Sequence, residues 1–124
     1  MLQPRLGKVQ LRMMQILWRE GKATARQITE ELGKTQPIAH STVQTLLRKL
    51  EAKGAVMHEL EDRTFLFRPL YRQEEVTETA LHDLLQRMFQ GSVYGMVSHL
   101  LKHESISEEE LRHLRQLIEK GTET

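Results

Sequence analysis

The sequence predicts a mainly α-helical protein with one small β-hairpin, and three observations support this. Apolar residues recur at three- and four-residue spacing along six stretches, the pattern of helices that bury one face. Glycines follow five of these stretches, where helices commonly end: Gly21, Gly33, Gly54, Gly91 and Gly121. Between the third and fourth stretches, residues 55–68 are instead rich in Val, Phe and Leu around a polar centre, which is typical of a hairpin.

The first three helices are expected at about residues 8–20, 24–33 and 41–53. Thr24 and Gln27 have the spacing of a capping box at the start of the second helix. Ser41 and Gln44 repeat that spacing at the start of the third, so a second capping box is expected there. The linker between these two helices contains Pro37, which disfavours helix just before it.

The hairpin is expected to pair residues 55–60 with residues 64–68, and Pro69 to end the second strand. Its polar tip, "EDR", lacks the Asn-Gly or Asp-Gly of the tightest turns, so the sequence leaves the turn type open.

Three more helices are expected in the C-terminal half. The first covers about residues 73–90, the second follows the capping residue Ser92, and the third opens at a capping box of Ser107 and Glu110. The predicted organisation is therefore a domain of residues 1–71 with three helices and a hairpin, followed by a helical domain of residues 72–124.

Composition excludes several classes of protein. The chain has 124 residues, of which 39% are apolar and 28% charged, and it contains no cysteine, so neither a disulfide nor a thiolate metal site is possible. No apolar run approaches the roughly 18 residues that span a bilayer, and "MLQPRLGKVQ" lacks the hydrophobic segment of a signal peptide. A cytoplasmic location without membrane insertion is expected.

The charge is unevenly distributed along the chain. Residues 1–72 hold 13 Lys and Arg against 7 Asp and Glu, a balance of +6, whereas residues 73–124 hold 5 against 10, a balance of −5. A basic half favours contact with a polyanion, although a swing of this size also arises by chance in short chains.

The third helix carries an unusual polar face. Val43, Leu46, Leu47 and Leu50 form its apolar stripe, and the opposite side holds Ser41, Thr42, Gln44, Thr45, Arg48 and Lys49. Short hydroxyls let a helix approach base edges closely, glutamine pairs with adenine, and arginine or lysine binds guanine or phosphate. Three helices followed by a hairpin is also the order of a winged helix-turn-helix, in which the third helix enters the major groove of DNA. DNA contact is therefore expected for these six residues.

The hairpin tip offers Arg63 as the wing contact with DNA, and Arg68 is a weaker candidate. Lys34 and Thr35, in the turn between helices, could meet phosphates. Any small helical domain also carries Lys and Arg on its surface, so the isolated cations indicate less than the set of Thr42, Gln44 and Thr45.

The C-terminal helices hold more large apolar residues than three short helices readily bury. Two copies packed together would bury them, so a homodimer is expected. The alternative is that these helices fold back over their own N-terminal domain. The residues expected at the dimer interface are Leu84, Leu85, Met88, Val97, Leu100, Leu101, Leu114 and Ile118.

Metal binding and catalysis receive little support. His99 and His103 have the spacing of a two-histidine metal site, and His82 and His113 are further candidates on neighbouring helices, but solvated histidines explain all four better. The sequence has no phosphate-binding glycine loop, nucleophile elbow or cysteine nucleophile, so neither an enzyme nor a cofactor is expected. The alternative function is a winged-helix module that binds proteins without recognising a DNA sequence.

The segment "STVQTLLRKLEAKGAV", followed by "DRTFLFRP", resembles the penicillinase and methicillin-resistance repressors, the BlaI/MecI family, which has copper-responsive CopY as a relative. The resemblance also covers "QLRMMQILW" and "GSVYGMVSHLLKHESIS". It implies a homodimeric repressor that binds a palindromic operator, with DNA contacts at Thr42, Gln44, Thr45, Lys49 and Arg63. Ser41 stands where the resemblance implies a cation, so a weaker phosphate contact is expected there.

The resemblance also indicates how such a repressor is released from its operator DNA. In the β-lactam-responsive members, a membrane-bound metalloprotease sensor triggers cleavage at an Asn-Phe bond in the dimerisation region. The corresponding pair here is His99-Leu100, so this chain departs from the family at that bond, and a regulatory protease stays an open partner. The cysteine motif of the copper-responsive relatives is absent.

Overall fold

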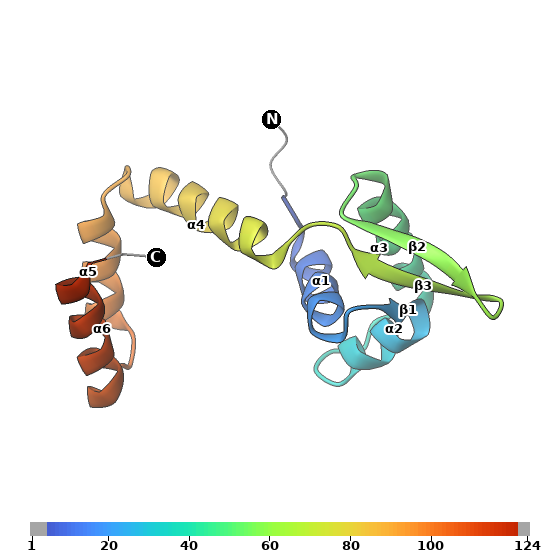
Figure 1. Cartoon of the computed structure of the whole chain (residues 1–124), viewed down its shortest axis with the longest axis horizontal. Coiled ribbons are helices and arrows are strands. Elements are labelled where there is room, and N and C mark those ends of the chain that lie inside the picture. The colour runs from blue at the N-terminus through green and yellow to red at the C-terminus, as the bar shows by residue number, and fades with distance from the viewer. Residues whose placement is uncertain (1–4, 122–124) are drawn as a thin grey trace. The chain divides into compact units, whose positions relative to one another are not determined.

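The computed structural model describes residues 5–121 and divides the chain into two compact units, Met1–Leu81 and His82–Thr124. The first unit contains three helices and a small sheet, and the division falls inside the fourth helix (Figure 1). The mainly helical class with a hairpin is confirmed.

The N-terminal unit follows the predicted order, with one addition. Its helices are α1 (Lys8–Glu20), α2 (Ala25–Gly33) and α3 (His40–Ala52), and its hairpin pairs β2 (Val56–Glu61) with β3 (Thr64–Pro69). A further strand, β1 (Ala23–Thr24), pairs antiparallel with β3, which gives the sheet the order β1-β3-β2. Two residues are too few to show strand alternation, so the sequence did not indicate β1.

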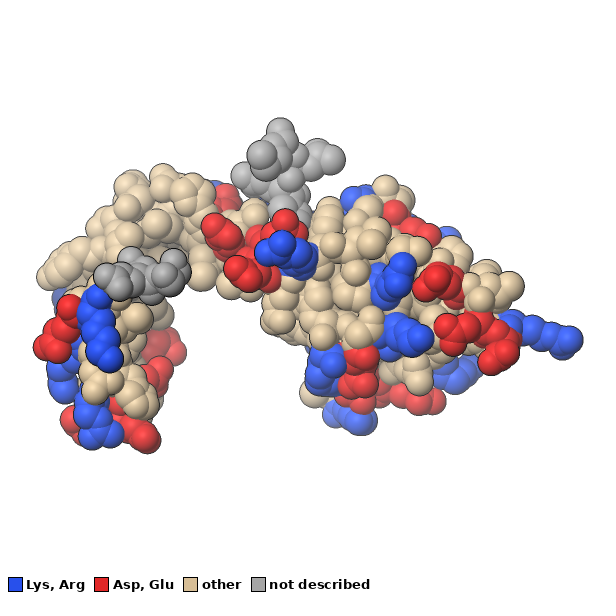
Figure 2. Space-filling model, viewed as in Figure 1, with Lys and Arg blue, Asp and Glu red and all other residues tan. Residues whose placement is uncertain are grey.

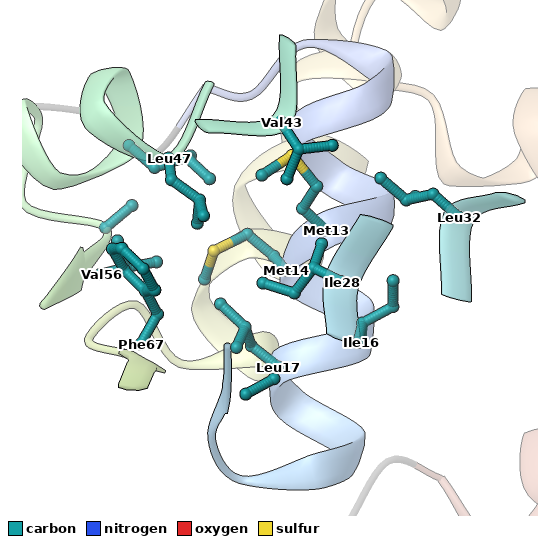
Figure 3. Packing of buried hydrophobic residues seen from close by; sticks show 13 residues of the cluster. Met13, Met14, Ile16, Leu17, Ile28, Leu32, Val43, Leu47, Val56 and Phe67 are labelled. Carbon is teal, nitrogen blue, oxygen red and sulfur yellow. The ribbon is translucent and has the colours of Figure 1, made fainter. Parts of the chain in front are cut away.

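The core of this unit lies between α1, the other two helices and the sheet. Met13 and Met14 of α1 are fully buried and point toward Val43 and Leu47 of α3 (Figure 3). Two consecutive buried methionines can fill the uneven space between helices and strands because the thioether chain is unbranched and flexible. The remaining members of the buried cluster are Ile16, Leu17, Ala23, Ile28, Leu32, Leu50, Ala55, Val56 and Phe67.

One of the two capping boxes predicted for this unit is confirmed. At the start of α2, the Gln27 N–H donates to Thr24 Oγ1 at 3.1 Å, and the Thr24 N–H donates to Gln27 Oε1 at 2.8 Å. The box predicted from Ser41 and Gln44 is wrong, because α3 begins one residue earlier, after the N-cap residue Ala39, which provides no side-chain cap.

The early start of α3 has a structural cause. His40, its first residue, places Nδ1 2.9 Å from Thr29 Oγ1 of α2 and is thereby held against that helix. Because the helix begins at His40, Ser41 lies inside the first turn and does not cap it. As a consequence, the side chains of Ser41 and Gln44 form no hydrogen bond with any residue of the described range 5–121.

The hairpin turn has two residues, Asp62 and Arg63, with φ angles of 49° and 66°. Positive φ at both central positions is the requirement of a type I′ turn, whose twist matches that of the flanking strands. This turn normally selects Asn-Gly because a Cβ atom is strained in the left-handed region. The wing therefore keeps an arginine at a position where glycine would fit better.

The remaining helices are α4 (Gln73–Phe89), α5 (Val93–His103) and α6 (Glu108–Lys120). Ser92 Oγ accepts from the Gly95 N–H at 2.9 Å and Ser107 Oγ from the Glu110 N–H at 3.1 Å, so both serines are N-caps. The capping box predicted from Ser107 and Glu110 is only half formed, because the described structure has no return bond from the Glu110 side chain to the Ser107 N–H. No residue of α5 or α6 is buried, and Val76 is the one buried residue of α4. Within residues 5–121 no helix has the length and apolar character needed to span a bilayer.

Candidate nucleic-acid interface

Helix α3 presents two contrasting faces. Val43, Leu47 and Leu50 are buried in the core. The six residues proposed from the sequence to contact DNA are all exposed: Ser41, Thr42, Gln44, Thr45, Arg48 and Lys49. The core thus fixes the rotation of the helix and turns this polar set outward, where a second macromolecule can reach it.

The hydroxyl and cation at the centre of this face are held by the helix itself. Thr45 Oγ1 donates to the Ser41 carbonyl oxygen at 3.0 Å, and Arg48 Nη2 donates to Thr45 Oγ1 at 3.2 Å. Neither Thr42 nor Lys49 forms a side-chain hydrogen bond or ion pair with another residue in the described part of the chain. Most of the donors and acceptors on this face are therefore available to a ligand.

The cations proposed outside α3 divide into two groups. Arg63, at the turn of the hairpin, is exposed and has no ion-pair partner among residues 5–121. Arg68 lies 3.7 Å from a carboxylate oxygen of Glu59 and also donates to Met57 Sδ at 3.3 Å. At the outer end of the hairpin a positive side chain extends beyond its neighbours (Figure 2).

The side chains in the turn between α2 and α3 are held by contacts within the protein. Lys34 Nζ lies 2.6 Å from Glu31 Oε2, and this hydrogen bond, followed by one from Arg19, holds the pKa of Glu31 below its ordinary value. Hydrogen bonds to Glu20 first and to Glu31 second raise the pKa of the Arg19 guanidinium. Thr35 accepts a hydrogen bond from the Arg12 guanidinium and donates to the Leu32 carbonyl oxygen at 3.3 Å. Lys34 and Thr35 are therefore weaker phosphate candidates than Arg63.

A groove of about 680 Å³ lies between the start of α2, one side of α3 and the hairpin. It brings together three of the residues proposed from the sequence, Gln44, Arg48 and Arg63. Ser41, Thr42, Thr45 and Lys49 do not line it. Sequence reasoning missed the other polar residues of the groove, among them Arg26 and His40, because no local pattern shows that their helices lie beside the hairpin.

One side of the groove carries an acid–imidazole pair beside aromatic rings. His58 Nδ1 lies 2.7 Å from Glu51 Oε1, which joins β2 to the last turn of α3. The His58 ring also lies against Phe65 and Phe67, with centroid distances of 4.6 and 5.4 Å. Of these contacts, the one between His58 and Glu51 joins the hairpin to α3, whereas the ring contacts lie within the hairpin.

The C-terminal unit places its candidate residues on α4, α5 and α6. The eight apolar residues proposed for the dimer interface are all exposed or half-buried, and Met88 and Ile118 are 63% and 73% exposed. On the face drawn in Figure 2, the surface over the end of α4 and the start of α5 carries few charged side chains.

The histidines considered as metal ligands also lie in this unit. The His99 and His103 ring centroids lie 4.3 Å apart with the rings tilted by 37°, and His99 also contacts Phe89 edge-on at 6.0 Å. Among residues 5–121, no three or more His, Asp or Glu side chains are arranged to hold a metal ion.

Comparisons with known proteins cover nearly the whole chain. The family model described as penicillinase repressor matches residues 6–120. The penicillinase repressor of Bacillus licheniformis is 30% identical over 116 residues, which cover 94% of this chain and 91% of that protein. The methicillin resistance regulatory protein MecI of Staphylococcus aureus is 21% identical over 93% of this chain and 94% of its own length.

Solved structures match the N-terminal part. The solution structure of the DNA-binding domain of the repressor BlaI is 29% identical, with a TM-score of 0.53, over 58% of this chain and 88% of that one. The Bacillus licheniformis BlaI monomer, solved in complex with the blaP half-operator, has a TM-score of 0.51 at the same identity and coverage. The family match, the relatives and the winged-helix neighbours agree, and the chain belongs to the penicillinase repressor family.

Proposed function

We propose that this protein is a DNA-binding transcriptional repressor that reads its operator with α3 and holds the neighbouring backbone with the hairpin. The observation that carries the proposal is the polar face of α3, six exposed residues opposite a buried stripe, beside a hairpin whose turn carries an arginine with no ion-pair partner among residues 5–121. The family match and the BlaI–half-operator structure among its structural neighbours support the same role.

The side chains of α3 suit a major groove. Ser41, Thr42 and Thr45 are short, so the helix axis can lie close to the bases, and a threonine methyl can pack against a thymine methyl. Gln44 is exposed, and its amide can pair with adenine in a bidentate manner. Lys49 and Arg48 supply positive charge to phosphates or guanine, and Arg63 supplies it from the wing.

The repressor acts as a homodimer on a palindromic operator in the cytoplasm. Residues 1–71 form the DNA-binding domain and residues 72–124 the dimerisation domain. Support comes from exposed apolar side chains on all three C-terminal helices, including Leu84 at 39%, Leu101 at 45% and Ile118 at 73%. Exposed apolar surface on this scale marks an interface, and two-fold symmetric dimers are the commonest assemblies.

Selection of bound duplexes from a random DNA pool tests the proposal. Enrichment of a palindromic sequence is expected, and Gln44→Ala should then weaken binding to the selected duplex by about 1–3 kcal/mol, with little change on random DNA. Gln15→Ala removes an exposed amide from α1 and serves as the matched control. If no sequence is enriched at moderate salt, the protein is better explained as a winged-helix module that binds other proteins.

A further inference from the structure

We infer that the groove between α2, α3 and the hairpin holds one sugar–phosphate strand of the bound duplex, and that Arg26 is a phosphate contact within it. The inference rests on the proposed function. It adds Arg26 of α2 to the DNA contacts already proposed for α3 and the hairpin turn. Arg26 lies in the first turn of α2 and is exposed.

The first argument is the distribution of unpaired charge. Within residues 5–121, Arg26, Arg48 and Arg63 have no ion-pair partner, whereas Arg19 is paired with Glu20 and Glu31. The three unpaired guanidinium groups come from α2, α3 and the hairpin turn, and all three line the same groove. Three positive charges that lie near one another repel, and a bound anion would remove that repulsion. The convergence of the arginines therefore favours an anionic ligand.

The second argument is the chemistry of the groove walls. Leu47, Phe65 and Phe67 give the groove an apolar side, and the arginines give it a cationic one. A sugar–phosphate strand has the same alternation, since the carbons of each deoxyribose are apolar and each phosphate carries a negative charge. Phe65 is 52% exposed, so its ring is available for such a contact.

The remaining titratable groups of the groove are consistent with this placement. Glu51 is the acidic residue among those that line it, and its carboxylate is 2.7 Å from His58 Nδ1. His40 is held by Thr29. A carboxylate repels phosphate, so the strand is expected to lie toward the three arginines and away from the Glu51–His58 pair.

The third argument is the geometry of a duplex. One backbone strand separates each major groove from the neighbouring minor groove. If α3 occupies the major groove and the hairpin reaches toward the neighbouring minor groove, the strand that separates the two grooves passes between α3 and the hairpin. The groove that contains Arg26 is the space between those two elements.

The test measures how salt weakens binding to a random-sequence duplex and to the selected duplex by fluorescence anisotropy. Each lost phosphate contact lowers the magnitude of the slope of log affinity against log salt by about 0.9. When the salt concentration rises fourfold, the drop in affinity of Arg26→Ala should therefore be about 3.5-fold smaller than that of wild type for each bound subunit. The ratio of affinities for the selected and random duplexes should stay unchanged, because phosphates carry no sequence information.

Two variants complete the design. Arg19→Ala removes the same charge from the same unit outside the groove, and Arg26→Lys keeps the charge and should restore the salt slope. Equal slopes for Arg26→Ala and Arg19→Ala, with wild-type protein binding both duplexes, would overturn the inference while leaving the proposed function intact. Failure of the wild-type protein to bind any duplex would overturn both.

Discussion

Replacing Arg63 by glycine is expected to stabilise the protein and to weaken its binding to DNA at the same time. Arg63 occupies the second central position of the hairpin turn with φ of 66° and has no ion-pair partner in the described chain. Glycine adopts this backbone conformation without steric cost. The side chain therefore strains the turn and contributes no ion pair to the fold in return.

The size of the effect follows from the turn geometry. A non-glycine residue in the left-handed region costs about 1–2 kcal/mol, and the greater freedom of glycine in the unfolded chain offsets about 0.5–1 kcal/mol of the gain. Arg63→Gly should therefore raise the free energy of unfolding by about 0.5–1 kcal/mol, which for a unit of this size raises Tm by about 2–8 °C. The same change removes one phosphate contact, so the salt slope should fall by about 0.9 per bound subunit.

Thermal unfolding by circular dichroism and anisotropy titrations at several salt concentrations measure the two effects. Arg63→Ala keeps a Cβ atom at the strained position, so its salt slope should fall as far as that of Arg63→Gly while its stability stays unchanged. Asp62→Gly relieves the backbone strain at the neighbouring position, where φ is 49°. This variant should be more stable than wild type and should keep the wild-type salt slope. If Arg63→Gly were no more stable than Arg63→Ala, the strain argument would be refuted, and a wild-type salt slope would refute the wing contact.

Two more predictions concern assembly and pH. Leu100→Glu places a carboxylate among the apolar side chains of α5 and should weaken the dimer at least about 100-fold in sedimentation experiments. The control Lys102→Glu, on the same helix, should leave the dimer intact. A dimer that tolerates Leu100→Glu would place the interface elsewhere. Because hydrogen bonds from Lys34 and Arg19 lower the pKa of Glu31, their stabilisation is present above the ordinary glutamate pKa of 4.5 and is lost as pH falls through the lowered value. Glu31→Gln should thus lower Tm near neutral pH and flatten its acid decline, unlike Glu30→Gln, and parallel pH profiles for the two variants would contradict this.

Local signals predicted most of the elements. The bounds of α1 and α2, the reciprocal cap between Thr24 and Gln27, and the order of helices and hairpin follow from apolar periodicity, capping residues and glycine stops. These signals act over a few residues and depend little on the rest of the chain. The polar face of α3 was visible for the same reason, since its apolar stripe fixes which side chains point outward.

Tertiary packing decided the features that depend on residues far apart in the sequence. β1 exists because β3 pairs with Ala23 and Thr24, and α3 begins at His40 where Thr29 holds its ring. The same holds for the groove that joins Arg26 to Arg48 and Arg63.

Local sequence patterns were therefore enough to predict the helices, the hairpin and the outward face of α3, because helical periodicity and caps are properties of neighbouring residues. The convergence of the cations, in contrast, depends on how the elements pack. Guanidinium groups that are 22 and 15 residues apart along the chain become neighbours of one groove when buried side chains pack α2, α3 and the sheet together. No local pattern of charges carries that information.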